Sequence, residues 1–191
     1  MGRERSYGAP PPRVLLRRVA AEDGTEFTAR ARASLELHRP WISCPTTPGR
    51  FAAYVAGFDG VTAVGYVVCL RESGAIAGFV NVRQIHRESY RRGVLGYGAF
   101  APYAGRGLMA EGLALAVRRG FGELGLHRLE ADVEPGNAAS LNLLKRLGFR
   151  REGFAAELIE IDGVWRDAER WAITTGMIGS SLPTFSDLDY E

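Results

Sequence analysis

A glycine-rich loop in the middle of the chain has the residue types most suited to binding a charged ligand. Gly105-Arg106-Gly107 lies between a predicted strand and a predicted helix that starts at Leu108. Such a loop can direct several backbone N–H groups at one phosphate, and the helix dipole adds about half a positive charge at that end. The Arg106 guanidinium could add a full charge. The loop therefore predicts a site for a phosphate-bearing ligand.

The glycine spacing of this loop resembles two common nucleotide-binding motifs, and neither fits. A P-loop requires Gly-Lys followed by Ser or Thr, whereas Leu113 follows Gly112 here. Gly105, Gly107 and Ala110 satisfy the dinucleotide pattern G-x-G-x-x-G/A, but that motif follows the first strand of a parallel βαβ unit. Here the loop follows three strands of antiparallel type. A glycine hinge that binds no ligand remains an alternative.

Two further groups of polar side chains follow the loop along the chain. Asn137 and Ser140 are three residues apart, so a helix that begins at Asn137 presents both on one face. In the preceding strand Glu130, Asp132 and Glu134 alternate and therefore share one face of the sheet. Carboxylates there could accept a proton from a substrate or form ion pairs with arginines.

The elements that must position these groups are predicted from the hydrophobic pattern and the turn residues. Strands are expected at residues 13–19, 64–71, 75–85, 94–100, 127–133, 149–161 and 165–173, and helices at 26–38, 51–58, 108–121 and 137–147. The order β-α-α-β-β-β-α-β-α-β-β predicts an α+β fold with a mixed, mainly antiparallel sheet flanked by helices.

Length and composition narrow the classes of protein. The 191 residues suit one domain, expected at residues 13–175, with flexible tails at 1–12 and 180–191. A net charge of +2 is too balanced to indicate a nucleic-acid partner. No stretch reaches the ~18 apolar residues that suggest a membrane span. Two distant cysteines and three single histidines lack metal-ligand spacing, so we expect no metal, and free thiols suit a cytoplasmic protein.

Motifs in the second half of the chain resemble one enzyme family. Asn137-Ala138-Ala139-Ser140, then Leu147-Gly148-Phe149 and Glu152-Gly153, resembles the N-x-x-S…LGF…EG signature of the GNAT superfamily of acetyltransferases. Gly107 occupies the first glycine of the family loop [QR]-x-x-G-x-[GA], although Ala104 and Met109 depart from that pattern. Residues 78–81, 95–97, 107–109 and 161–167 further resemble the ribosomal-protein alanine N-acetyltransferases. The resemblance extends from about residue 13 to residue 173.

This resemblance implies a GNAT fold, in which the fourth strand splays from the fifth and acetyl-coenzyme A lies in the gap. The pantetheine arm would pair with the strand that ends at Ala99 and Phe100, and the pyrophosphate would bind the N–H groups from Gly105 to Met109. Asn137 would cap its helix or contact the pantetheine arm. The expected cofactor contacts are Ala99, Phe100, Gly105, Arg106, Gly107, Leu108, Met109, Asn137 and Ser140.

The resemblance also implies a direct attack of an amine on the thioester, without a covalent enzyme intermediate. Backbone N–H groups at Ala99 or Phe100 would stabilise the tetrahedral oxyanion. Ser140 would donate a hydrogen bond to the leaving thiolate, since Leu144 stands where many members have a tyrosine. Asp132 is the first candidate for a base or a water-orienting group. Glu130 on the same strand face is the second catalytic carboxylate that we expect.

The acceptor is less closely defined than the reaction. Trp41 and His86 are predicted to line the acceptor pocket, although a packing or surface role suits each of them as well. The predicted acceptor is the N-terminal α-amine of a protein, such as a ribosomal protein, and the enzyme is expected to be a monomer or a homodimer. The alternatives are a small-molecule amine such as an antibiotic or polyamine, or a coenzyme A-binding regulator without turnover. An open groove beside residues 36–45 would favour peptides.

Overall fold

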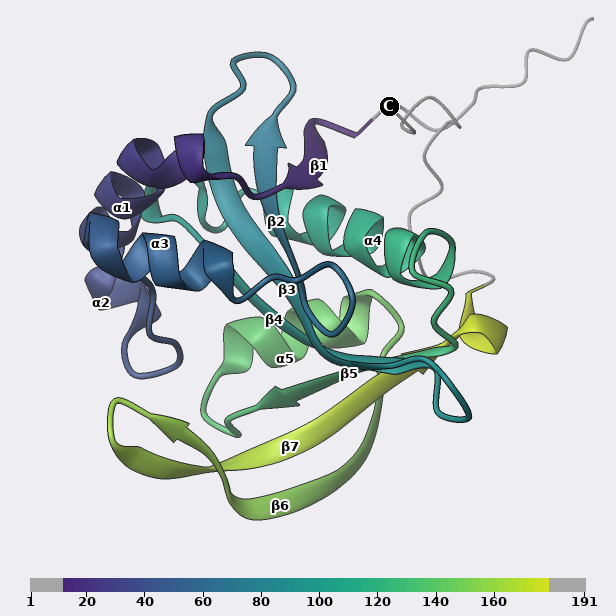
Figure 1. The fold of residues 1–191 in the computed structure, drawn as a ribbon. Coiled ribbons are helices and arrows are strands. Elements are labelled where there is room, and N and C mark those ends of the chain that lie inside the picture. The colour runs from purple at the N-terminus through teal and green to yellow at the C-terminus, as the bar shows by residue number, and fades with distance from the viewer. Residues whose placement is uncertain (1–11, 179–191) are drawn as a thin grey trace, which may run out of the picture.

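One seven-stranded sheet organises residues 12–178, the part of the chain that the computed structural model describes (Figure 1). The strand order is β1-β2-β3-β4-β5-β7-β6. The strands are β1 (Val14–Arg18), β2 (Val64–Leu70), β3 (Ile76–His86), β4 (Arg92–Ala99), β5 (Arg128–Val133), β6 (Arg150–Ile161) and β7 (Val164–Thr174). Apart from Pro12, the tails predicted at 1–12 and 180–191 lie outside the described residues.

Helices cover both faces of this sheet (Figure 1). The α-helices are α1 (Gly24–Ala33), α2 (Leu35–His38), α3 (Pro48–Ala56), α4 (Leu108–Phe121) and α5 (Ala138–Arg146), and short 3₁₀ turns are η1 (Ala21–Asp23), η2 (Ala101–Tyr103) and η3 (Thr175–Met177). None of the helices within residues 12–178 is long and apolar enough to cross a membrane.

Two apolar clusters hold the helices to the sheet. On one face Leu113 and Val117 of α4 are fully buried against β2 residues such as Val68. On the other face Phe27 of α1 and Phe51 of α3 pack in a second cluster with their ring centroids 5.1 Å apart. Because β2 is covered on both sides, nearly all of its residues are buried. This strand, the second in the sheet, therefore lies between two layers of helices.

The sheet is antiparallel except between β4 and β5. These two strands are parallel and pair only from Arg92 to Val94 of β4, with Arg128 to Glu130 of β5. Beyond these three pairs β4 continues to Ala99 with β3 as its partner on one edge. Its other edge faces a gap that opens towards the start of α4. The predicted mixed, mainly antiparallel sheet with two splayed strands is thus confirmed.

The helix predicted at residues 26–38 is interrupted at Ser34, and the structure shows why. The Ser34 hydroxyl donates to the Arg30 carbonyl at 2.7 Å and accepts the N–H of Ala101 at 2.9 Å. A serine that bonds to backbone groups competes with the helical pattern and often bends the helix. The break lets α2 take a new direction, and it ties this region to the turn that follows β4.

Candidate functional site

A cavity of about 470 Å³ lies where β4 and β5 diverge. Four segments supply its walls: the end of α2 with the loop after it, the last residues of β4, the glycine loop with the first turn of α4, and the first turns of α5. These segments are distant in the sequence and meet only because the sheet splays here.

The glycine loop enters the cavity with its backbone. Gly105 and Gly107 have φ angles of 74° and 79°, a left-handed conformation that only glycine adopts without strain. Gly107 is the N-cap of α4 and supplies no side chain to its first turn. The first N–H groups of a helix have no partner inside the helix. The loop therefore presents free donors and the positive end of a helix dipole to the cavity.

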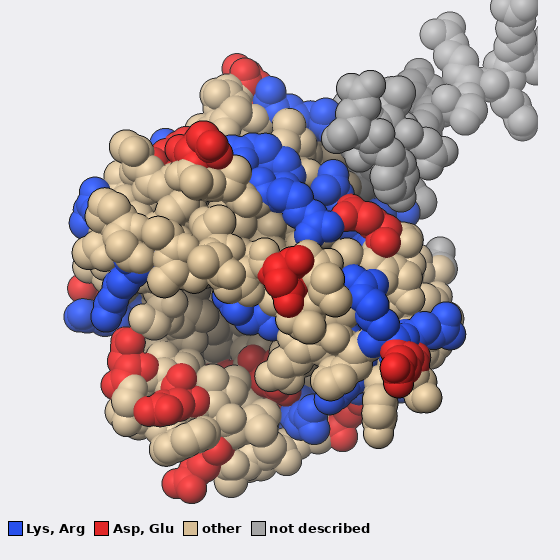
Figure 2. Space-filling view, viewed as in Figure 1, with Lys and Arg blue, Asp and Glu red and all other residues tan. Residues whose placement is uncertain are grey.

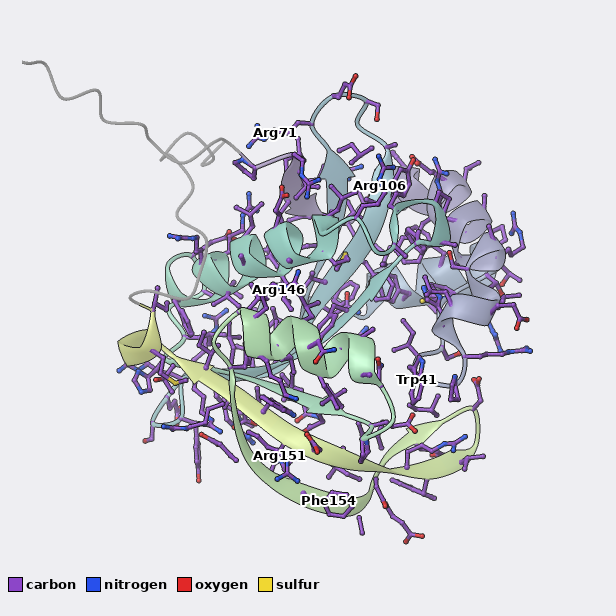
Figure 3. All side chains as sticks on the ribbon, turned by 180° about the vertical axis from the view of Figure 1, so that it is seen from behind. Trp41, Arg71, Arg106, Arg146, Arg151 and Phe154 are labelled. Carbon is purple, nitrogen blue, oxygen red and sulfur yellow. The ribbon has the colours of Figure 1, made fainter. Side chains whose placement is uncertain are left out.

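A salt bridge braces the outer side of this loop. The Arg13 guanidinium pairs with Glu111 of α4 at 2.6 Å and donates to the Arg106 carbonyl at 3.0 Å. The Arg106 side chain itself is exposed and is not part of the cavity wall, whereas Arg146 of α5 is (Figure 3). Arg106 is thus placed at the rim, and Arg146 is a cation that the sequence prediction did not select.

The last residues of β4 show which backbone groups face the gap. The Phe100 N–H donates to the Ala77 carbonyl of the neighbouring segment at 2.9 Å. Because the direction of N–H groups alternates along a strand, the N–H of Ala99 points the other way, into the gap. The Phe100 ring is fully buried and meets Phe27 edge-on. The prediction of a cofactor contact at Phe100 is therefore wrong, while Ala99 is well placed.

Ser140 and Asn137 both reach the cavity, as their spacing predicted. Asn137 Oδ1 accepts the N–H of Ser140 at 3.1 Å, which caps α5 and fixes its first turn. The Ser140 hydroxyl lies 2.5 Å from the Tyr97 hydroxyl of β4. Tyr97 belongs to the Leu95-Gly96-Tyr97 match, but nothing in the sequence indicated that it would meet Ser140.

The two predicted catalytic carboxylates have different surroundings. Glu130 is 6% exposed and bonds to Arg92 at 2.8 Å and to Arg128 at 2.6 Å. It also lies 3.5 Å from Arg170 and lines a separate pocket of about 270 Å³. Three arginines thus occupy its oxygens, and Glu130 does not line the cavity of about 470 Å³. This geometry contradicts a direct catalytic role for Glu130.

Asp132 lies beyond the last β4–β5 pair, on the same strand face. Its Oδ1 is 3.3 Å from Arg170 Nε, with which it forms an ion pair. Burial raises the pKa of Asp132 above its usual range, although the charge of Arg170 acts in the opposite direction. Asp132 is not part of the cavity wall. If Asp132 acts on a substrate, it does so from the face of β5 that lies beside the gap.

Of the two residues predicted to line the acceptor pocket, Trp41 lies at the cavity and His86 lies far from it. Trp41 lines the cavity and crosses the gap, since a Cβ added at Gly136 would lie 3.1 Å from its indole (Figure 3). His86 is an exposed residue at the far end of β3, and its ring meets Tyr90 at 6.3 Å. It pairs with Arg92, seven residues or roughly 23 Å along β4 from Ala99. The prediction for His86 is wrong.

His38 is a buried residue that the sequence prediction missed. It is 4% exposed, lines the cavity, and its Nε2 lies 2.8 Å from the Ala99 carbonyl, to which it donates as a neutral ring. Its Nδ1 is buried with no hydrogen-bond partner among residues 12–178. Burial lowers the pKa of His38, and the bond to Ala99 only partly offsets this effect. His38 therefore attaches α2 to the gap side of β4.

A hollow opens on the face of the molecule that carries α2 and α3. Figure 2 shows it between these helices and the β6–β7 hairpin, with acidic side chains on the hairpin side of its rim. Four acidic residues near the turn of the hairpin are exposed: Glu157, Glu160, Asp162 and Asp167. A Cβ added at Gly96 of β4 would meet no atom within 4 Å, so space is open above this strand. The hollow is therefore open, and the hairpin side of its rim is negatively charged.

Residues 12–178 contain no group of three or more His, Cys, Asp or Glu side chains placed to hold a metal ion. The polar groups that line the cavity are instead backbone N–H groups, three hydroxyls, two amides, an imidazole and a guanidinium, from Tyr97, Tyr103, Ser140, Asn137, Asn142, His38 and Arg146. These groups suit a phosphate-containing ligand with an extended polar arm.

Known proteins share this architecture. The family model "Acetyltransferase (GNAT) domain" matches residues 13–150. The ribosomal protein uS5-alanine N-acetyltransferase of Escherichia coli is 40% identical over 100 residues, 52% of this chain and 52% of the relative. The spermidine N(1)-acetyltransferase of Escherichia coli is 28% identical over 107 residues, 56% of this chain and 55% of the relative. The chain thus spans about half the length of the curated relatives it matches.

A solved structure matches over more of the chain. Mycobacterium smegmatis RimJ in complex with CoA-disulfide superposes with a TM-score of 0.82 and 25% identity. The match covers 92% of this chain and 88% of that one. The GNAT fold expected from the sequence motifs is confirmed.

The buried His38 makes the stability of this region depend on pH. Since its pKa is lower in the folded state, the neutral ring stabilises the fold above the unfolded pKa of ~6.5, and this contribution is lost as pH falls through the folded pKa. His38→Gln keeps a donor for Ala99 but does not titrate. We expect it to cost about 1 kcal/mol at pH 7.5 and to lose less stability than the wild type on acidification to pH 5.

The check is the free energy of unfolding from urea titrations of both proteins at the two pH values. His86→Gln, at an exposed histidine, serves as the matched control and should keep the wild-type pH dependence. Equal pH dependence in His38→Gln and the wild type would contradict the assignment.

Proposed function

Because the chain belongs to the GNAT acetyltransferase family, we propose that it transfers the acetyl group of acetyl-coenzyme A to the N-terminal α-amine of a protein. One observation carries the proposal: the free edge of β4 and the free N–H groups of the glycine loop face the same cavity of about 470 Å³. In one continuous site, the strand edge can bind an extended arm that contains amides, and the loop can bind a pyrophosphate.

The residues of the cavity fit acetyl-coenzyme A. The N–H groups from Gly105 to Met109 would bind the pyrophosphate, because helix N-termini and glycine loops favour phosphate groups. The free edge of β4 at Tyr97 would pair with the pantetheine arm, and Asn137 lies close enough to the same wall to contact it. Arg146 would add a positive charge. Bound there, the cofactor supplies the reactive thioester.

The chemistry requires a neutral amine, a donor for the oxyanion and a stabilised leaving group. An α-amine has a pKa near 8, so roughly a tenth of it is neutral at pH 7. Asp132 would accept the ammonium proton through water. The Ala99 N–H would donate to the oxyanion. Ser140 would donate a hydrogen bond to the departing sulfur.

The acceptor face favours a polypeptide. An enclosed pocket would suit a small amine, whereas Figure 2 shows an open hollow with room for a chain beyond the amine. The acidic rim suits a positively charged N-terminal segment. A polyamine is the second candidate, since the same negative charge would attract it and a relative is named for spermidine.

The test is thiol release from acetyl-coenzyme A with α-amino peptides that begin with Ala or Ser, and with spermidine, side by side. We expect the highest kcat/KM with peptides that carry basic residues after the first position. Activity on spermidine alone would replace the peptide proposal by polyamine acetylation. No thiol release with any amine, while acetyl-coenzyme A binds, would support a regulator without turnover.

Gly107→Glu should abolish cofactor binding. A carboxylate about 4 Å from a phosphate costs roughly 4 kcal/mol at an effective dielectric constant of 20, so the affinity for acetyl-coenzyme A should fall at least about 100-fold. Gly163→Glu is the matched control, because Gly163 has the same φ of 79° and lies in the β6–β7 turn with open space around it. Calorimetry that finds equal affinities for the two variants would remove the phosphate-loop assignment.

Asp132→Asn should move the pH–rate profile for a peptide acceptor towards higher pH. Without the carboxylate, the reaction depends on amine that is already neutral, and the neutral fraction rises as the pH passes through the amine pKa of about 8. Glu130→Gln is the control, since that side chain is occupied by arginines. It should reduce stability and leave the profile in place. A profile that does not move in Asp132→Asn would leave Asp132 as an ion-pair partner of Arg170.

A further inference from the structure

Two hydroxyl groups meet at the place where the leaving sulfur is expected. The Tyr97 hydroxyl comes from β4, the Ser140 hydroxyl comes from α5, and their oxygens are 2.5 Å apart. Both residues line the cavity between the splayed strands. The hydrogen bond therefore joins the two walls of the site, and it joins Ser140 to a group that the proposed chemistry has not used.

Each partner is held independently. Ser140 lies in the first turn of α5, where its N–H is bound by Asn137 Oδ1 at 3.1 Å. Tyr97 lies in the middle of β4, opposite Val80 of β3. A strand and a capped helix turn are both rigid supports, so the two hydroxyls meet without the rearrangement of a loop. The pair is thus formed before any ligand enters.

The direction of the hydrogen bond decides what Ser140 can offer to a ligand. A serine hydroxyl has one hydrogen and two lone pairs. If Ser140 donates to Tyr97, its hydrogen is not available to the cavity. If Tyr97 donates to Ser140, the serine hydrogen is free to point elsewhere. Burial raises the pKa of Tyr97 to about 12, so the phenol retains its proton throughout the neutral range and can always be the donor.

We propose that Tyr97 is a positioning residue for Ser140: its O–H donates to Ser140 Oγ and thereby directs the serine hydrogen to the leaving sulfur. The inference rests on the proposed function. When the C–S bond of the thioester breaks, the sulfur keeps the electron pair and becomes a thiolate. The chain Tyr97–Ser140–sulfur stabilises that charge by two consecutive hydrogen bonds, which polarise one another. No bond within Tyr97 or Ser140 breaks, and solvent later protonates the thiolate.

A double-mutant cycle separates this role from simple packing. Tyr97→Phe removes only the hydroxyl and should lower kcat about 3- to 10-fold, the effect of one neutral hydrogen bond, with the KM for acetyl-coenzyme A little changed. If Tyr97 acts through Ser140, Tyr97→Phe should have no further effect on kcat in the Ser140→Ala background. Tyr90→Phe is the matched control, because Tyr90 is 72% exposed in the turn before β4. It should behave as the wild type.

An equal effect of Tyr97→Phe in both backgrounds would overturn the proposal, because the phenol would then act independently of Ser140. So would an unchanged kcat in the single variant.

A second readout needs no amine and so distinguishes this inference from the proposed function. The ionisation of bound coenzyme A can be followed by the ultraviolet absorbance of its thiolate across a pH series. We expect the lowest thiol pKa in the wild type, a higher one in Tyr97→Phe, and the highest, equal values in Ser140→Ala and the double variant. If this order holds while no amine is acetylated, the proposed function fails and the hydroxyl pair stands. If acetyl transfer occurs but all four proteins give the same thiol pKa, the pair has no role at the sulfur.

Discussion

The structure depends on one interruption of backbone pairing. β4 and β5 pair over three residues and then diverge after Glu130, which leaves one edge of β4 without a strand partner. Unpaired N–H and carbonyl groups are costly unless something else binds them. His38 takes the Ala99 carbonyl at 2.8 Å, and the hydroxyls of Tyr97 and Ser140 connect the strand to α5 across the gap. What remains free along this edge is available to a ligand, so the break in the sheet creates the site.

The sequence predicted the parts of this site that depend on local geometry. A loop of Gly105-Arg106-Gly107 before a helix has few conformations, and both glycines have the left-handed φ that such a loop needs. Asn137 and Ser140 have the spacing of a helix cap, and the structure shows that hydrogen bond. The alternation of apolar residues and the turn signals also predicted the succession of strands and helices along the chain. In each case the information lies within a few neighbouring residues.

The errors arise where a residue's surroundings come from distant segments. The N–H that faces the gap belongs to Ala99 and not to Phe100, because the pairing of β4 with β3 decides which N–H groups point away from β3. Glu130 was expected to be catalytic, but two of the arginines that bind it, Arg92 and Arg170, come from other strands. His86 lies at the wrong end because β3 and β4 are antiparallel. Tyr97 and His38 were missed for the same reason, since their partners are 43 and 61 residues away.

Amide hydrogen exchange, with and without acetyl-coenzyme A, tests the central claim most directly, namely that the cofactor binds the free backbone donors of β4 and of the glycine loop beside the gap. The amides of Ala99 and of Gly107 to Met109 should exchange readily in the free protein and slow at least about 10-fold in the complex. Phe100, whose N–H already donates to Ala77, should be protected in both states and serves as the internal reference. Tight binding without protection at Ala99 and in the glycine loop would contradict the account.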